Sequence, residues 1–261
     1  MPYKKSLLLL IIYIAAAAWP CTRLSAARMP QGIDPEYRLM DRPSDLRPSR
    51  TQWKAGQVVD ASLIEAEGAD RWFTSQSIND ATFKRMYGRS YKRDCTVPRS
   101  QLRLIHVLHW NEDGKIQMGE MVCHHSISTD LISIFRELFR AHYPISRMVL
   151  VDEYGADDER SMTANNSSCF NFRRVAGTQV LSKHSRGLAV DINPLRNPMV
   201  KHTADGRLKV SPSAGHPYAD RSKKFDQRID HTDLCYRLFT AHGFKWGGSW
   251  KRSKDYQHFE K

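Results

Sequence analysis

Residues 182–194 read Ser182-Lys-His184-Ser-Arg-Gly187-Leu-Ala189-Val-Asp191-Ile-Asn-Pro194, with six residues between the imidazole and the carboxylate. The glycine lets the backbone turn tightly between these two side chains, and the alanine leaves space beside the carboxylate. If residues 188–192 form a strand, Asp191 points away from its apolar neighbours, because side chains alternate along a strand. The carboxylate can therefore face a cleft while the neighbours pack in the core.

A second polar stretch lies near the C-terminal end, where Trp246-Gly-Gly-Ser-Trp250 is followed by Asp255-Tyr-Gln-His258-Phe-Glu260. The paired tryptophans argue against a solvated tail. On a terminal strand His258 and Glu260 would point to the same side. Asp255 would reach that side only if residues 255–257 bend.

The two stretches together supply the donors of a metal site. A single His or Asp is more often an ordinary surface or core residue. Two histidines and one carboxylate, however, are the ligand set of a catalytic zinc with one open position. We therefore predict that His184, Asp191 and His258 bind Zn²⁺, and that Asp255 is available as a general base.

The composition indicates a globular and basic protein. The chain has 261 residues, of which 41% are hydrophobic and 26% charged, with a formal net charge of +12. This length is sufficient for one domain with an extension. The positive charge is compatible with an anionic partner, such as cell-wall polymer, a membrane surface or nucleic acid, or with solubility alone. Basic and aromatic positions are not interleaved for base stacking, so we expect no nucleic-acid partner.

Residues 1–27 have the pattern of a signal peptide. Lys4 and Lys5 precede an apolar run over residues 6–18, and small residues at 24–27 offer a cleavage site. The run is too short for a membrane span. We therefore expect a periplasmic or secreted protein with no stable membrane span after cleavage; a retained N-terminal anchor is the alternative.

The remaining chain divides into an extension and a folded domain. Residues 28–70 are rich in Pro, Arg and Asp and predict a partly disordered N-terminal extension. Residues 71–261 carry the hydrophobic periodicity and the metal-site motifs. We expect them to form one domain and the protein to be a monomer.

Four cysteines follow the signal peptide. An even number in an oxidising compartment favours disulfides, and four cysteines allow three pairings. We favour Cys95–Cys123 and Cys169–Cys235, because each pair would join neighbouring parts of the chain. A four-cysteine zinc site is the alternative, but no C-x-x-C spacing supports it.

The hydrophobic pattern predicts an α+β fold. Residues 102–110 and 117–124 alternate as two strands joined by Asn111-Glu-Asp-Gly114, a hairpin signal. Ser128 is expected to cap an amphipathic helix that Pro144 ends. We expect a small antiparallel sheet with helices on one side and the zinc in a cleft on the sheet.

Further segments are less regular. A helix is expected within 72–91 and another over 230–242 with Gly243 as its C-cap, and a short buried strand over 148–151. Residues 194–226 read as a long loop, and loops of that length inside a domain are usually functional.

The motifs also carry a resemblance. Ser182-x-His184-x-x-Gly187-x-Ala189-x-Asp191, together with Asp255-x-x-His258, resembles the VanY-type D-alanyl-D-alanine carboxypeptidases, zinc peptidases of bacterial cell-wall metabolism with the LAS-type metallopeptidase fold. The likeness extends over about residues 95 to 261 and does not cover 28 to 70. Other matching stretches are Ser161-Met-x-x-Asn165-Asn166-x-Ser168-x-Phe170-Asn171-Phe-Arg173, Asn193-Pro194, Asn197-Pro198, Tyr218-x-Asp220-Arg221 and Trp246-Gly-Gly-x-Trp250.

The resemblance implies roles for single residues. His184, Asp191 and His258 fall on the zinc ligands, and Asp255 falls on the general base. The family binds the substrate carboxylate or stabilises the oxyanion with an arginine, for which Arg173 is the candidate here and Arg174 the alternative. The residues expected to line the substrate pocket are Ser168, Tyr154 and Trp246.

The activity implied by the resemblance is peptide-bond hydrolysis. The substrate would be a peptidoglycan stem peptide cleaved next to a D-amino acid, by a carboxypeptidase or an endopeptidase. The alternative is a non-catalytic zinc-containing module that binds the cell wall. That reading predicts the loss of a ligand or of the base, whereas all four positions are filled in this sequence.

Overall fold

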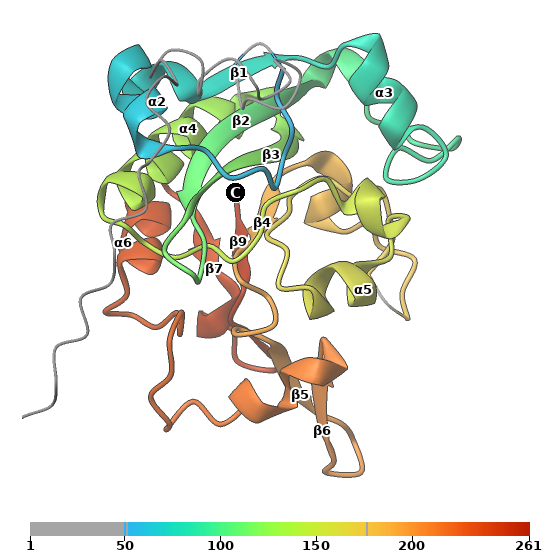
Figure 1. Cartoon of the computed structure of the whole chain (residues 1–261). Helices are drawn as coiled ribbons and strands as arrows, with labels where there is room; N and C mark the ends of the chain where they lie inside the picture. The colour runs from blue at the N-terminus through green and yellow to red at the C-terminus, as the bar shows by residue number, and fades with distance from the viewer. Residues whose placement is uncertain (1–49, 51, 176) are drawn as a thin grey trace, which may run out of the picture. The chain divides into compact units, whose positions relative to one another are not determined.

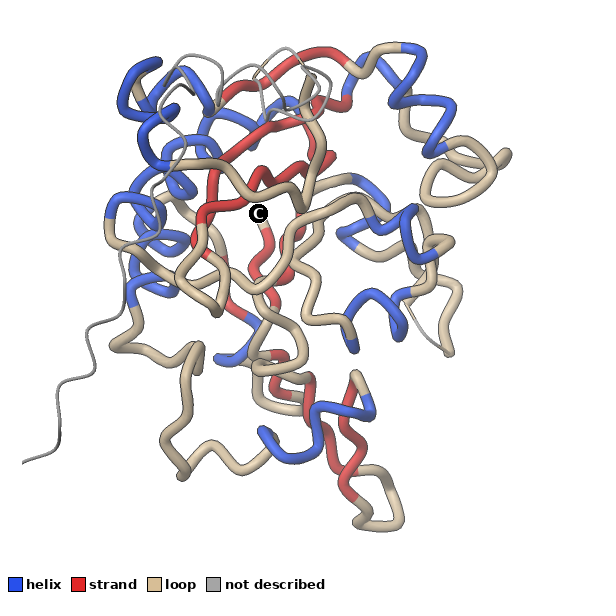
Figure 2. The backbone as a smooth tube through the Cα atoms, in the orientation of Figure 1, coloured by secondary structure: helices blue, strands red, loops and turns tan. Residues whose placement is uncertain are grey.

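The computed structural model describes residue 50, residues 52–175 and residues 177–261. Within these residues the strands form three small antiparallel sheets of three strands each, ordered β1-β2-β3, β4-β9-β7 and β6-β5-β8 (Figures 1 and 2). Helices are interspersed with the strands along the chain. The predicted α+β class is confirmed.

The largest sheet contains β1 (Thr74–Ser77), β2 (Leu102–Trp110) and β3 (Ile116–His124). The predicted hairpin is present, with Leu102 paired to His124 at one end and Trp110 to Ile116 at the other. The Asn111 side chain closes the turn by accepting the backbone N–H of Lys115 at 2.8 Å.

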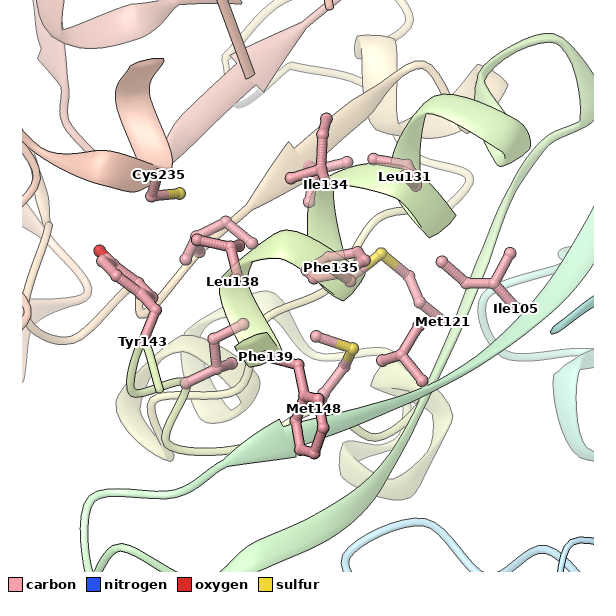
Figure 3. Packing of buried hydrophobic residues seen from close by; sticks show 14 of the residues in the cluster. Ile105, Met121, Leu131, Ile134, Phe135, Leu138, Phe139, Tyr143, Met148 and Cys235 are labelled. Carbon is pink, nitrogen blue, oxygen red and sulfur yellow. The ribbon is translucent and has the colours of Figure 1, made fainter. Parts of the chain in front are cut away.

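Helix α4 (His125–Arg140) packs its apolar stripe on this sheet (Figure 3). Leu131, Ile134, Phe135 and Leu138 are buried, as the periodicity predicts. The helix begins at His125, earlier than the predicted Ser128 cap. The reason is that the side chain of His124 accepts the backbone N–H of Ser126 and so caps the helix one turn sooner.

The outer edge of β3 is covered by the segment before the predicted domain boundary. Backbone N–H groups of Gly56 and Val59 donate to β3 carbonyls at 2.7 and 2.9 Å, and Trp53 stacks on His106 with ring centroids 4.3 Å apart. Helix α2 (Ala61–Glu67) follows. Residues 52–70 of the expected extension therefore pack on the sheet, whereas residues 28–49 and the expected signal peptide lie outside the described residues.

The second sheet joins distant parts of the chain. It contains β4 (Ala189–Asp191), β7 (Lys245–Trp246) and β9 (His258–Glu260), with β9 in the middle. The strand predicted over 188–192 and the terminal strand are thus hydrogen-bonded neighbours (Figure 1). Helix α6 (Leu234–Ala241) precedes β7.

Helix α6 is shorter than the predicted 230–242. Asp233 accepts the backbone N–H of Cys235 and Tyr236 and so begins the helix at Leu234. Asp230 instead closes a separate turn by accepting the backbone N–H of Thr232 at 2.9 Å. Gly243 follows the helix end with φ +83°, the left-handed conformation expected of a glycine there.

The prediction of a long loop over 194–226 is wrong. This segment contains β5 (Met199–His202) and β6 (Leu208–Ser211), which form a hairpin, and the 3-10 helix η6 (Ser213–Tyr218). Strand β8 (Lys254–Asp255) completes the third sheet beside β5. Main-chain pairing with β8, which comes from far along the chain, is a tertiary contact that local composition does not reveal.

Two further local predictions differ from the structure. Residues 148–150 do not form a strand, and a 3-10 helix, η4 (Val151–Tyr154), begins at Val151. In the segment 72–91 a helix is present, α3 (Asp80–Met86), but β1 precedes it. The remaining short elements are η2 (Ala69–Trp72), η3 (Arg99–Gln101), α5 (Asp158–Thr163), η5 (Lys183–Arg186) and η7 (Gly247–Ser249).

The favoured disulfides are not formed. Cys95, Cys123, Cys169 and Cys235 are all free thiols, and all but Cys95 are buried. Among the described residues no helix is both long and apolar enough to cross a membrane.

Candidate metal centre

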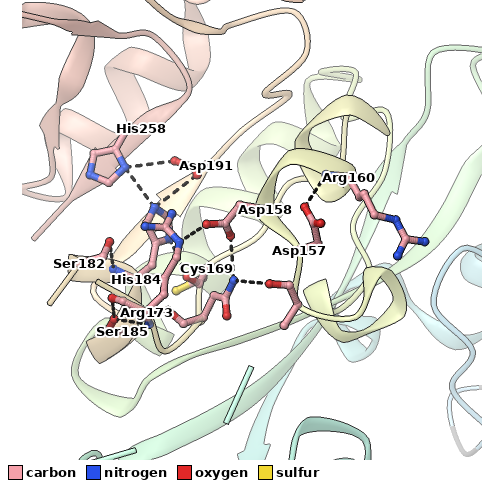
Figure 4. Close-up of polar contacts among 12 residues, drawn as sticks. Asp157, Asp158, Arg160, Cys169, Arg173, Ser182, His184, Ser185, Asp191 and His258 are labelled. Atoms are coloured by element: carbon pink, nitrogen blue, oxygen red, sulfur yellow. Dashed lines mark hydrogen bonds and ion pairs between the residues drawn. The ribbon is translucent and has the colours of Figure 1, made fainter. Parts of the chain in front are cut away.

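Three buried side chains converge where β4 and β9 lie beside η5. One ligand atom each from His184, Asp191 and His258 lies within 4.8 Å of the others (Figure 4). The Nε2 atom of His184 is 3.2 Å from Nδ1 of His258. The Asp191 carboxylate lies 3.3 Å from the first of these nitrogens and 3.1 Å from the second. The three predicted zinc ligands therefore meet.

Local backbone features bring these groups together. Ser182 caps η5 by accepting the His184 N–H, and Gly187 ends it in the left-handed conformation with φ +67°. A Cβ on this glycine would lie 2.6 Å from the backbone nitrogen of His124, so no larger residue fits. The register of the second sheet pairs Asp191 directly with His258, which puts both side chains on one face.

The outer nitrogens of both histidines have acceptors. Nδ1 of His184 lies 2.6 Å from the carbonyl oxygen of Cys169, and Nε2 of His258 lies 3.4 Å from the Glu260 carboxylate. A histidine that donates its outer N–H to such an acceptor directs the other nitrogen's lone pair at a metal. Two oriented imidazoles and a carboxylate suit a divalent metal such as zinc. Glu260 was not assigned this role from the sequence, although its spacing from His258 was the available signal.

The charges in the site reinforce one another. Burial by itself would raise the pKa of Asp191, but His184 and His258 hold it well below its usual range. Burial opposes a charge on His258, yet the carboxylates of Asp191 and Glu260 raise its pKa to about 10. The two carboxylates therefore favour a positive charge on the imidazole of His258.

Asp255 lies in the same cavity as the three ligand candidates. It ends β8, and the chain turns at residues 256–257 before His258 begins β9, so the bend that it requires is present. Desolvation raises the pKa of Asp255 to about 6, although His258 opposes the shift. A carboxylate with a pKa near neutrality is suited to taking and returning a proton.

Gly247 explains how Asp255 can lie so close to the second sheet. A Cβ at this position would lie 2.7 Å from the Asp255 carbonyl oxygen and 3.2 Å from Cβ of His258. The glycine in the Trp246-Gly-Gly-Ser-Trp250 motif therefore provides the space in which the last strands approach each other. The ring of Trp250 lies 5.3 Å from that of His258.

Of the two arginine candidates, Arg173 lies at the cavity. Its guanidinium forms an ion pair with Asp158 (Figure 4). The other carboxylate oxygen of Asp158 accepts the Asn171 amide at 2.7 Å. Its backbone N–H donates to Oγ of Ser185 at 2.8 Å, which ties it to the helix that carries the first histidine. Arg174 is not among the cavity residues, and its guanidinium binds the carbonyl oxygen of Gln179.

The cavity has a volume of about 670 Å³. Its walls are formed by α5, by the segment around Leu181, by the hairpin β5-β6 and by the C-terminal strands. Both charged and apolar side chains contribute: Asp158, Glu159, Met162, Arg173, Val175, Val180, Leu181, Ser182, Lys183, His184, Arg186, Asp191, Met199, Ser211, Trp250, Asp255, Gln257, His258 and Glu260.

The three predicted pocket residues lie elsewhere. The backbone of Ser168 pairs with that of Asp191, so this residue holds the ligand strand without lining the cavity. Tyr154 lines a separate cavity with Arg147. The indole of Trp246 donates to the carbonyl oxygen of Tyr256 at 2.9 Å and is 5% exposed, which makes it part of the core.

Comparison with known families agrees with the motifs. A family model described as D-alanyl-D-alanine carboxypeptidase matches residues 176–261, the range that contains all three ligand candidates and Asp255. The match supports the resemblance to the VanY-type family and a peptidase of this general kind. Peptidases of this family depend on a metal, and the His–Asp–His group can bind one. Comparison with curated proteins and with solved structures gives no significant match.

Proposed function

We propose that the protein is an exported zinc metallopeptidase that hydrolyses peptidoglycan stem peptides next to a D-amino acid. The observation that carries this proposal is the convergence of His184, Asp191 and His258 in a cavity that also holds the carboxylate of Asp255. A binding module would need the donors alone. The raised pKa of a further carboxylate beside them favours a hydrolytic site.

The chemistry divides between the metal and the chain. When bound, zinc supplies a Lewis acid and lowers the pKa of a coordinated water to roughly 7. Asp255 accepts a proton as water attacks the peptide carbonyl, and returns it to the leaving amine. Arg173, held by Asp158, orients a substrate carboxylate or the carbonyl oxygen as charge develops on it.

Carboxypeptidase and endopeptidase activities use the same steps. They differ in whether the cavity is closed beyond the leaving group. Glu159 of α5 accepts the backbone N–H and the hydroxyl of Ser213 at 2.6 and 2.7 Å, which joins α5 to η6 beside the hairpin β5-β6. Glu159 also lines the cavity, so we propose that this contact restricts substrate length at that wall.

The activity can be tested with isolated muropeptides. Purified protein is incubated with them in the presence and absence of a chelator, and products are followed by mass spectrometry. We expect loss of D-alanine or cleavage of cross-links that stops on chelation and returns with added Zn²⁺. If intact muropeptides are bound but never cleaved, the protein is a wall-binding module and the peptidase proposal is wrong.

Export is tested separately. Fractionation of cells that produce the full chain should recover a shortened protein in the periplasm or medium if residues 1–27 are removed. A full-length protein retained in the membrane fraction would instead support the N-terminal anchor.

A further inference from the structure

The third sheet presents one of its faces to the cavity. Its register places Met199 beside Ser211 on one side and beside Asp255 on the other. Side chains paired in this way point to the same face, and all three line the cavity. Val210, which alternates with Ser211, is buried on the opposite face. The face that carries Asp255 is therefore the wall of the cavity.

Two lysines continue this face. Lys201 and Lys209 lie two residues beyond Met199 and Ser211, and they are paired directly across the hairpin. Two residues along a strand amount to about 6.6 Å, and they return the side chain to the same face. Both lysines are exposed. They form a second row of side chains on the same face, next to the row that ends in Asp255 but outside the residues that line the cavity.

The direct pairing of Lys201 with Lys209 is expected to lower the stability of the hairpin. Like charges placed directly opposite each other on neighbouring strands are destabilising. Other exposed cations, such as Arg207 and Lys223, have carboxylate partners. Among the ion pairs of the described residues, none involves Lys201 or Lys209. Lysine on an edge strand also discourages aggregation, and both lysines lie at an edge, because β8 pairs with β5 only at Met199 and Val200.

We infer that Lys201 and Lys209 form a subsite for a carboxylate of an acidic peptide substrate, about two residues from the bond that is cleaved. This inference rests on the proposed function and extends it to substrate selection. A row spacing of about 6.6 Å matches two residues of an extended peptide lying along the hairpin. Stem peptides whose γ-linked D-glutamate keeps a free α-carboxylate would be preferred over those in which this group is amidated.

The experiment compares two synthetic stem peptides that differ only in amidation of that carboxylate. Steady-state kinetics and equilibrium binding by fluorescence anisotropy are measured for the wild type and for Lys201→Gln/Lys209→Gln. The control is Lys84→Gln/Lys115→Gln, which removes the same charge from exposed lysines on α3 and the β2-β3 turn. Activity on the amidated peptide reports whether the catalytic site of each variant is intact.

We expect the hairpin variant to lose about five-fold in kcat/KM for the acidic peptide, mainly through KM, and to keep its activity on the amidated peptide. The wild-type preference should also shrink at high salt, because exposed charges are screened. If the hairpin variant keeps the preference, or the control loses it equally, the subsite does not exist. Failure of the wild type to cleave either peptide would refute the proposed function, and the binding data would then decide on the lysines separately.

Discussion

At the scale of single residues, the site depends on side chains that have distinct tasks. His184, Asp191 and His258 supply donors, while Glu260 and the Cys169 carbonyl orient the two imidazoles. Asp255 is near enough to share the cavity, but none of its hydrogen bonds is to a ligand candidate; it accepts the amide of Gln257 at 3.2 Å. We therefore expect the proposed metal binding and the proposed proton transfer to respond separately to substitution.

Replacing Asp255 with Ala should abolish turnover and leave the metal bound. Loss of a general base typically costs 10²- to 10⁴-fold in rate. Zinc content by atomic absorption and muropeptide cleavage are measured on the same preparation. If zinc is lost together with activity, Asp255 is a ligand and its assignment as base is wrong.

Replacing Glu260 with Gln should weaken metal binding. The amide can still accept a hydrogen bond from His258, but it lacks the charge that increases the basicity of the imidazole. Loss of such an orienting group typically lowers metal affinity by about 10- to 100-fold. Competition with a fluorescent zinc chelator measures the affinity. Glu137→Gln, an exposed carboxylate on α4, is the matched control and should bind zinc as the wild type does.

At the scale of elements, the site depends on how closely short segments approach. The first histidine lies on η5, which ends at Gly187 against the backbone of His124, where β3 passes into α4. The backbone N–H of His124 donates to the Gly187 carbonyl oxygen at 2.9 Å. The main sheet thereby supports the loop that carries the ligand, and a side chain at the glycine would push the two apart.

Gly187→Ala should therefore destabilise the fold by roughly 2–4 kcal/mol, because it adds a collision to the strain of a positive φ. The control is Gly114→Ala, which has φ +70° and no atom within 4 Å of the added Cβ. Urea denaturation of both variants separates strain from collision. If both variants lose the same free energy of unfolding, the close approach of Gly187 to the His124 backbone does not contribute to stability.

At the scale of the whole molecule, the main sheet contains two histidines that should make the fold less stable at low pH. Burial, with a contribution from Arg85, lowers the pKa of His106 to about 4. Burial also lowers the pKa of His109 to about 4. Between pH 6.5 and 4 the unfolded chain binds protons at these positions that the folded chain does not. The contribution of these two neutral histidines to the free energy of unfolding is thus fully present above pH 6.5. It is lost progressively as the pH falls toward 4.

Each of these histidines should lower the free energy of unfolding by on the order of 2 kcal/mol when the pH is changed from 7 to 5. The free energy of unfolding is measured in urea at both pH values for the wild type and for His106→Gln. The variant should lose less stability than the wild type on acidification. Comparing the two proteins cancels the titration of other groups, so an identical pH dependence would contradict the assignment.

Much of the fold was predictable wherever the pattern is local. The β2-β3 hairpin follows from alternation and the Asn111 turn, and the apolar face of α4 follows from its 3.6-residue period. The start of α4 was not predictable in this way, because a histidine cap is uncommon. The hairpin β5-β6 was also missed, since its strands are short and only half apolar, and its pairing with β8 joins segments distant in sequence.

The candidate site divides in the same way. The sequence by itself identified the candidate donors His184, Asp191 and His258, because the residue types and the motif around each of them are local properties that a strand or turn preserves. Only the tertiary structure decided what surrounds them: that Arg173 and not Arg174 reaches the cavity, that Tyr154 and Trp246 do not, and that Glu260 holds the last histidine. The physical reason is that side-chain neighbours depend on the register and crossing of segments far apart along the chain.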